Sequence, residues 1–280
     1  MRTVSKRTKR LGTKKKKALN ADELNSYKVA YGTPLGFEDV FKNVIVPGIV
    51  FAIFGFVQLY YWWLSLIYFG IGCFYGWRVI LPKVVKKNYE KQSFDQINQW
   101  INNLTLILTD ESKTIYRALA IVSERAEGEF KSELKQLESR LYGADNERIR
   151  DSFRMLSDKY SDDVIFIRFC EQLEAAAIEG KSNVETLKDI KSDHNDLKER
   201  QEYFQRKKDE HFTGMKTLGG LLLMVYLVLP MSAGWGLFFD AYARNITGYV
   251  ATALYSFVMY RFYIKYMKYY FDNSVLEVDV

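Results

Sequence analysis

The sequence has few residues that interrupt helices, form disulfides or bind metals: its 280 residues include four prolines, two cysteines and two histidines. So few prolines, together with long apolar and amphipathic runs, predict helix throughout and an all-α fold. Cys73 and Cys170 lie far apart in an apolar run and an amphipathic segment, so we expect packed thiols and no disulfide framework. His194 and His211 share a polar stretch without a cysteine or carboxylate cluster at ligand spacing, which disfavours a metal site.

Residue patterns that carry out catalysis are missing as well. The sequence has no Ser/His/Asp arrangement, no paired catalytic carboxylates and no glycine-rich cofactor loop. The run Glu179–Ser182 reads Glu-Gly-Lys-Ser, like the end of a phosphate-binding loop, but Ala175 stands where that motif needs a glycine. The residues before it also predict a helix instead of a strand. We therefore expect a helix end at Gly180, no enzyme activity and no bound cofactor.

Charged residues are absent from two long stretches, 43–77 and 217–239. A bilayer core of about 30 Å needs roughly 20 apolar residues in a helix, so both stretches predict membrane insertion. The first is too long for one span, which predicts a hairpin that turns at a group of aromatic residues suited to a membrane–water interface. These residues are Tyr60, Tyr61, Trp62 and Trp63. The predicted spans form two pairs, at about 44–60 and 62–81 and at about 217–239 and 246–264.

Small and charged residues add detail to these pairs. A short loop with Asp240 and Arg244 joins the second pair, and Arg261 near the end of the last span is expected to reach the headgroups. No span has an ionisable residue in its middle, which disfavours a pump. Glycines in the first pair would let its helices approach closely; they are Gly48, Gly55, Gly70, Gly72 and Gly76.

Lysine and arginine positions set the expected orientation. Basic clusters occur in the N-terminal tail, after the first pair, before the second pair and after the last span, whereas the predicted outer turns have almost none. The positive-inside rule then puts every cluster, and both termini, in the cytoplasm of a multi-pass protein of the cell membrane. Because about forty polar residues precede the first apolar run, no cleaved signal peptide is expected.

The N-terminal tail is basic and is expected to be disordered. Its run Lys14, Lys15, Lys16 and Lys17 would be attracted to anionic lipid headgroups, at about 1 kcal/mol per residue near the surface, besides helping to set the topology. A specific nucleic-acid site is disfavoured, because no aromatic residue lies between the basic residues of the first 20 positions.

These patterns divide the chain into five parts. They are a tail at 1–42, a transmembrane hairpin at 43–82, a cytoplasmic helical bundle at 83–215, a second transmembrane pair at 216–266 and a cytoplasmic tail at 267–280.

The bundle is predicted to contain six amphipathic helices, whose apolar residues recur at helical spacing. A cap at Ser112 or Thr114 is expected to start the second helix, which would run to Gly128, and Gly143 is expected to end the third. The expected apolar faces, helix by helix, are Phe94, Ile97, Ile101, Leu104 and Leu108; Ile115, Leu119 and Val122; Phe130, Leu134, Leu137 and Leu141; Ile149, Phe153 and Leu156; Val164, Ile167, Cys170, Leu173 and Ala177; and Val184, Leu187 and Ile190.

The sixth of these helices begins near Ser182 and becomes almost wholly polar over 193–210. A helix this polar is expected to bury little of its own surface. We predict that it continues as one charged helix directly into the third span, where it could pass a movement of the bundle to the membrane.

Four segments between residues 96 and 230 form a distinctive series. They are the helix–break–helix Leu104–Leu119, Leu141-Tyr142-Gly143 followed by a new helix, Phe169–Leu187 with its glycine helix end, and the charged run Lys198–Lys208 leading into Thr217–Pro230. This arrangement resembles the type II secretion system F domain, in its TadB/TadC-like variant. Glu111 departs from the pattern, because a glycine is common in the family at this helix break.

This resemblance implies a platform protein at the base of a pilus-like or secretion machine. Its cytoplasmic domain would contact a hexameric secretion ATPase, and its spans would contact pilin-like subunits in the bilayer. The chain has room for one such domain, which implies action as a homo-oligomer or with a sister subunit. Two alternatives stay open: a channel-lining component of a conjugation or transport complex, and a membrane-tethered scaffold.

Overall fold

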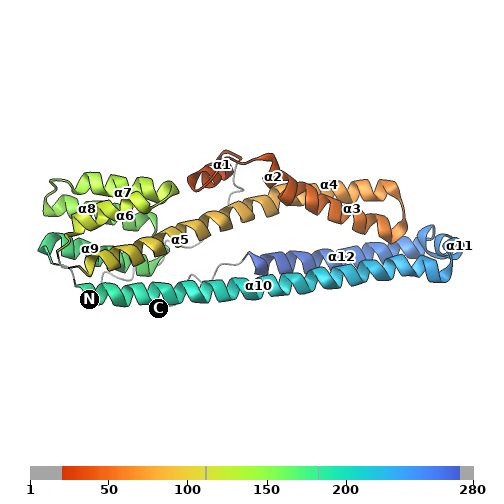
Figure 1. The fold of residues 1–280 in the computed structure, drawn as a ribbon. Coiled ribbons are helices and arrows are strands. Elements are labelled where there is room, and N and C mark those ends of the chain that lie inside the picture. The colour runs from red at the N-terminus through yellow and green to blue at the C-terminus, as the bar shows by residue number, and fades with distance from the viewer. Residues whose placement is uncertain (1–20, 111, 182, 272–280) are drawn as a thin grey trace, which may run out of the picture.

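The residues that the structure describes, 21–110, 112–181 and 183–271 of a computed structural model, are helical and contain no strand. This confirms the predicted all-α fold. The chain is elongated, with a bundle of short helices at one end and long apolar helices at the other (Figure 1). The elements are α1 Ala21–Ala30, α2 Phe37–Val40, a π-helical turn Phe41–Ile45, α3 Val46–Leu59, α4 Trp62–Tyr75, a π-helical turn Gly76–Ile80, α5 Leu81–Leu108, α6 Ile115–Arg125, α7 Gly128–Leu141, α8 Asn146–Lys159, α9 Val164–Glu179, α10 Val184–Ala233, α11 Trp235–Phe238, a π-helical turn Phe239–Ala243 and α12 Ile246–Tyr270.

Three continuous helical stretches are long and apolar enough to cross a membrane: Phe37–Leu59, Trp62–Leu108 and Val184–Ala233. The second and third contain 47 and 50 residues, or roughly 70–75 Å at about 1.5 Å per residue, more than twice the thickness of a bilayer core. α12, which contains the fourth expected span, is not among the three. Its tyrosines and Arg261 lower its hydropathy.

The predicted hairpin turns at Tyr60, which has the left-handed φ of 56° and closes α3 with its amide on the Phe56 carbonyl. Close packing between α3 and α4 depends on glycine. A Cβ atom on Gly55 would lie 2.7 Å from the Tyr68 ring, and one on Gly48 would collide with the Cys73 sulfur. Gly72 and Gly76 also lie in this contact, whereas Gly70 faces open space. The predicted role is thus confirmed for four of the five glycines.

We expect Gly72→Ala to destabilise the hairpin and Gly70→Ala to leave it intact. A Cβ at position 72 would lie 2.8 Å from the Gly48 Cα atom and 3.0 Å from the Pro47 carbonyl oxygen, and backbone atoms cannot turn aside. Overpacking of this kind costs about 1–3 kcal/mol. Thermal denaturation of the two variants in the same detergent should show a lower midpoint for Gly72→Ala only; equal midpoints would contradict the close contact.

The turns of the two apolar pairs pack against each other. Leu59, Phe238 and Ala243 are buried together, with Tyr60, Tyr61, Leu64, Phe239 and Tyr242 around them. The Tyr60 hydroxyl also donates a hydrogen bond to the Tyr226 carbonyl of α10, at 3.4 Å. Both turns therefore lie at the same end of the molecule, far from the bundle (Figure 1). Asp240 and Arg244 are exposed there and form a 4.0 Å surface ion pair, which contributes little stability.

Helices α5 to α9 and the start of α10 enclose one hydrophobic core. Trp100 of α5 lies at its centre, with ring centroids 5.4 to 5.8 Å from Phe169, Phe166 and Phe130. Of the two predicted caps, Ser112 and Thr114, it is Thr114 that caps α6, by accepting from the Arg117 amide. The apolar faces predicted for α5 to α8 are buried.

Two details of the bundle differ from the predictions. α6 ends at Arg125, and Gly128 starts α7 with a φ of 61°, because its backbone lies against α1, where a Cβ would be 2.5 Å from the Ala30 carbonyl. The buried face of α9 contains Phe166 and Phe169, whereas Val164 is 47% exposed. Aromatic rings bury more apolar area than valine, so they take the core side of a helix that is apolar on both faces.

The expectation of a disordered tail is wrong from residue 21 onward. α1 and the segment after it pack on the start of α5, where Leu24, Val44, Leu81 and Val85 are buried together. The apolar residues of α1 are too sparse to predict a stable helix on their own. The tertiary contact with α5 stabilises this helix. The lysines at 14–17 lie outside the described residues.

Candidate functional site

The bundle joins the two long helices through a group of polar side chains on α5, α10 and the residue before α9. Its centre is His194, in the stretch of α10 that was expected to bury little. That expectation is wrong at this position, because the His194 side chain is fully buried. The site lies where the bundle meets the two helices that lead to the apolar end.

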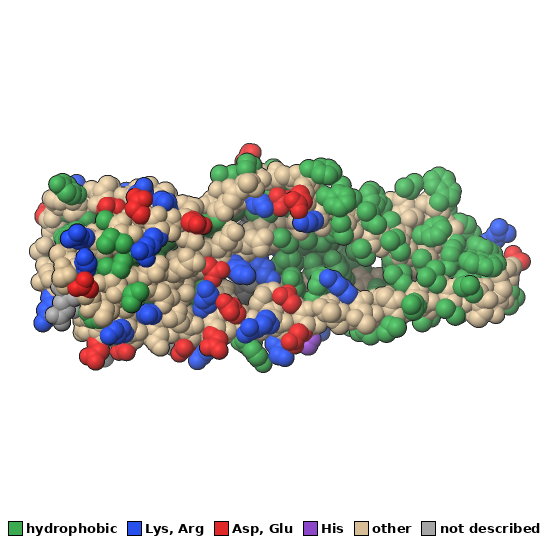
Figure 2. Space-filling view, viewed as in Figure 1, with side chains coloured by type: hydrophobic (Ala, Val, Ile, Leu, Met, Phe, Trp, Pro, Cys, Tyr) green, Lys and Arg blue, Asp and Glu red, His purple; other side chains and the backbone are tan. Residues whose placement is uncertain are grey.

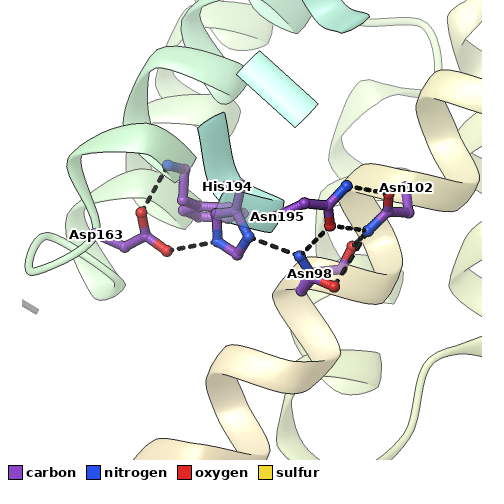
Figure 3. Close-up of polar contacts among 6 residues, drawn as sticks. Asn98, Asn102, Asp163, His194 and Asn195 are labelled. Atoms are coloured by element: carbon purple, nitrogen blue, oxygen red, sulfur yellow. Dashed lines mark hydrogen bonds and ion pairs between the residues drawn. The ribbon is translucent and has the colours of Figure 1, made fainter. Parts of the chain in front are cut away.

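The His194 ring is held on three sides. Figure 3 shows its two polar contacts, with Asn98 and Asp163. It stacks on Phe94 of α5, with ring centroids 4.6 Å apart and planes 16° apart. Asn98 Nδ2 lies 2.9 Å from its Nδ1, and Asp163 Oδ2 lies 3.0 Å from its Nε2. Because Asn98 Nδ2 is a donor, Nδ1 must accept, and the proton is then on Nε2 and is donated to the carboxylate. One tautomer satisfies every contact.

Asparagines extend this arrangement along the α5–α10 contact. Asn195 Oδ1 accepts from Asn98 Nδ2 and from Asn102 Nδ2, each at 2.9 Å. Asn195 Nδ2 donates in return to Asn102 Oδ1 at 3.1 Å. Reciprocal amide pairs have one satisfying geometry, so they fix the register of α10 against α5.

Asp163 connects the same site to α9. Its Oδ1 accepts from the Phe166 amide at 2.9 Å and caps the helix, while its Oδ2 accepts from His194. One carboxylate thereby holds the first turn of α9 and the side of α10. We call Asn98, Asn102, Asp163, His194 and Asn195 the polar joint.

Charged pairs lie at the edge of the polar joint. Lys198 of α10 contacts Asp95 of α5 at 3.0 Å, and Arg168 of α9 lies 3.9 Å from Asp193. Among the described residues no cluster of three or more His, Cys, Asp or Glu could hold a metal ion. The polar joint consists of hydrogen bonds between side-chain amides, one carboxylate and a histidine ring stacked on Phe94.

A second polar group connects α5, α7 and α8 beside the N-terminal region. The Tyr89 hydroxyl donates to Glu129 at 2.8 Å, and Lys159 donates to Glu129 and Glu133 at 2.6 Å. Burial raises the pKa of Glu129, but the hydrogen bonds from Lys159 and Tyr89 outweigh it and hold this pKa below its usual value. The Tyr31 ring of the N-terminal region lies 5.5 Å from Tyr89 and covers this pair.

Other residues singled out in the sequence have structural roles. Gly180 adopts a φ of 72° and closes α9, in agreement with the predicted helix end. Both cysteines are free thiols, and burial raises the pKa of Cys170 well above its usual value, which keeps it unreactive.

Sequence reasoning missed the polar joint, although a signal was present. His194 follows Leu187 and Ile190 at helical spacing, on the buried side of α10, and Asn98 and Asn102 flank the buried Ile101 of α5. When a polar residue lies within the apolar stripe of each of two helices, the two residues are expected to be buried and to hydrogen-bond to each other.

Comparisons with known proteins find one relative of nearly the same length. No protein family's sequence profile matches the chain, and no solved structure matches it. A protein of Bacillus anthracis described as uncharacterized protein pXO2-23 is 42% identical over 266 residues, which cover 95% of this chain and 96% of the relative.

Proposed function

This chain belongs to the same family as the uncharacterized Bacillus anthracis protein, and we propose that it is a multi-pass platform subunit of the cell membrane. In this proposal it couples a cytoplasmic secretion ATPase to pilin-like subunits in the bilayer, as part of a pilus-like or type II-like secretion machine. The helical bundle is the cytoplasmic domain that the resemblance to the secretion F domain implies. The termini are both cytoplasmic.

Four spans are supported by the arrangement of the apolar helices. α12 lies along α10, and α3 and α4 lie beside them (Figure 1). Hydrogen bonds connect the pairs: the Tyr68 hydroxyl of α4 lies 2.8 Å from the Ser256 hydroxyl of α12, which donates to Gln58 of α3 at 3.3 Å. Hydrophobic side chains cover this half of the molecule, and charged side chains cover the other half (Figure 2). If α12 stayed outside the bilayer, its partners on α3 and α4 could not enter it.

The observation that carries the proposal is the continuity of α10. One helix of 50 residues runs from the core of the bundle, where Leu187 and Ile190 are buried, to the outer turn at Ala233. Between Val184 and Gly214 it contains neither glycine nor proline. This stretch can transmit displacement or rotation from the bundle as far as Gly214, and the polar joint fixes its cytoplasmic end. Three glycines and Pro230 lie in the apolar part of α10. A scaffold that only holds a partner has no need of this rigidity.

The far end of the bundle has a surface suited to a protein partner. Tyr142 is 92% exposed and Tyr116 is 42% exposed, and both lie beside a depression between α6 and α7 that Glu138 also lines. Exposed aromatic residues of this kind are common in protein interfaces. This end points away from the apolar half (Figure 1), toward the side where an ATPase would work.

Co-purification tests the proposal. Tagged full-length protein, extracted in mild detergent from its own cells, is expected to retain a hexameric secretion ATPase, whereas an unrelated tagged multi-pass protein from the same cells should not. Reconstituted protein that conducts ions on its own would instead indicate a channel-lining component. Retention of a different cytoplasmic protein, without the ATPase, would indicate a scaffold.

A further inference from the structure

Lysines and aromatic residues gather where α5, α10 and α12 leave the apolar half of the molecule. The α5 lysines reach the end of α12: Lys87 Nζ lies 4.3 Å from the centre of the Tyr270 ring, and Lys83 Nζ lies 5.2 Å from that of Phe271. We call the group the lysine–aromatic cluster; its members are Lys83, Lys87, Lys208, Phe212, Lys216, Tyr266, Tyr269, Tyr270 and Phe271.

The α10 members meet α12 in the same way. Lys216 Nζ lies 4.3 Å from the Phe212 ring, and the Phe212 ring stacks on Tyr266 with centroids 6.1 Å apart. Lys208, only 7% exposed, lies 6.0 Å from the Tyr269 ring. An aromatic ring attracts an ammonium group without cancelling its charge, unlike a carboxylate.

Among the described residues, positive charge is in excess at this level of the molecule. Segments 83–91, 206–216 and 261–271 contain eleven lysines and arginines but three acidic residues. Two of these acids have ion-pair partners on their own helices, since Glu90 contacts Lys86 and Glu210 contacts Lys207. The third, Asp209, accepts from the Tyr270 hydroxyl at 3.2 Å. The Tyr266 hydroxyl is buried here without a hydrogen-bond partner among the described residues.

Exposed apolar side chains begin directly beside the cluster. Leu218 of α10 is 63% exposed and Phe262 of α12 is 64% exposed, and Figure 2 shows Lys and Arg side chains at the border of the hydrophobic surface. Lysine and tyrosine at such a border lie at headgroup level when the apolar surface is in a bilayer. A free phosphate ion would use the lysines only, whereas a phospholipid would use both surfaces.

From this juxtaposition we infer that the lysine–aromatic cluster binds the headgroup of an anionic phospholipid, whose acyl chains lie along the exposed apolar faces of α10 and α12. The inference rests on the membrane insertion in the proposed function and not on the secretion partners. It assigns lipid contact to residues other than the lysines at 14–17.

Titration of the purified full-length protein with phosphatidylglycerol or phosphatidylcholine tests this inference, with bound lipid read by native mass spectrometry. Phosphatidylglycerol should bind more tightly. The double variant Lys87→Gln/Lys216→Gln should bind it roughly thirtyfold more weakly, because each lysine near a lipid surface contributes about one factor of five. The variant Lys131→Gln/Lys135→Gln makes the same charge change on α7 and should bind like the wild type, as should Lys87→Arg/Lys216→Arg.

Equal binding of the two lipids, or equal losses in the two glutamine variants, would overturn the inference. Inorganic phosphate that competes as well as phosphatidylglycerol would overturn the lipid part of it and leave a free-anion site. A protein that retains the ATPase but shows no lipid preference refutes this inference alone. A protein that stays soluble without detergent refutes membrane insertion itself.

Discussion

Insertion of a short Gly-Ser linker after Gly214 is expected to abolish filament assembly or export while the protein accumulates at its normal level. Gly214 lies between the charged and apolar parts of α10, and nothing lies within 4 Å of a Cβ built there, so the point of insertion is not packed against another element. Each glycine in a helix costs about 1 kcal/mol relative to alanine, and several in a row let the two halves rotate independently. The measurement is assembly or export in cells that express only the variant.

A control separates lost coupling from misfolding. The same linker placed after Gly180, in the exposed loop between α9 and α10 where a Cβ also meets nothing, should leave activity unchanged. The Gly214 variant should still co-purify with the ATPase, because the bundle is intact. If export survives the insertion after Gly214 at normal protein levels, rigid coupling through α10 is wrong.

Replacement of His194 by alanine is expected to lower the free energy of unfolding of the bundle by about 2–4 kcal/mol. The variant loses the stacking on Phe94 and leaves a cavity. It also removes the proton donor of Asp163, whose carboxylate stays mostly buried at a side-chain exposure of 13%. Denaturation of the detergent-purified protein, followed by circular dichroism, measures the loss.

His211→Ala is the matched control, since it removes the same side chain from an exposed position of the same helix. We expect it to change stability by less than about 0.5 kcal/mol. Equal effects of the two substitutions would show that the polar joint does not stabilise the bundle. Asp163→Asn offers a further check: its amide oxygen can still accept from His194, so it should cost less than His194→Ala.

Much of the architecture could be predicted because it follows from local chemistry. A helix that enters a bilayer must satisfy its own backbone and exclude charge, so the charge-free stretch 43–77 and its aromatic middle marked the hairpin and its turn at Tyr60. The run 184–213, which contains neither glycine nor proline, likewise predicted one helix that continues into the third span. The helix ends at Gly143 and Gly180 could be predicted for the same reason, since the left-handed backbone conformation after a helix favours glycine.

The polar joint was decided only in three dimensions. Whether His194 is buried depends on Phe94 and Asn98, which lie about a hundred positions earlier in the chain, and on Asp163 at the start of another helix. α1 likewise becomes ordered through its contact with α5. The sequence by itself determined which segments are helices and which are apolar, because those properties depend on neighbours within a few residues. The tertiary structure decided which polar groups are buried together, because the cost of burying a polar group is offset only when its partner is in place.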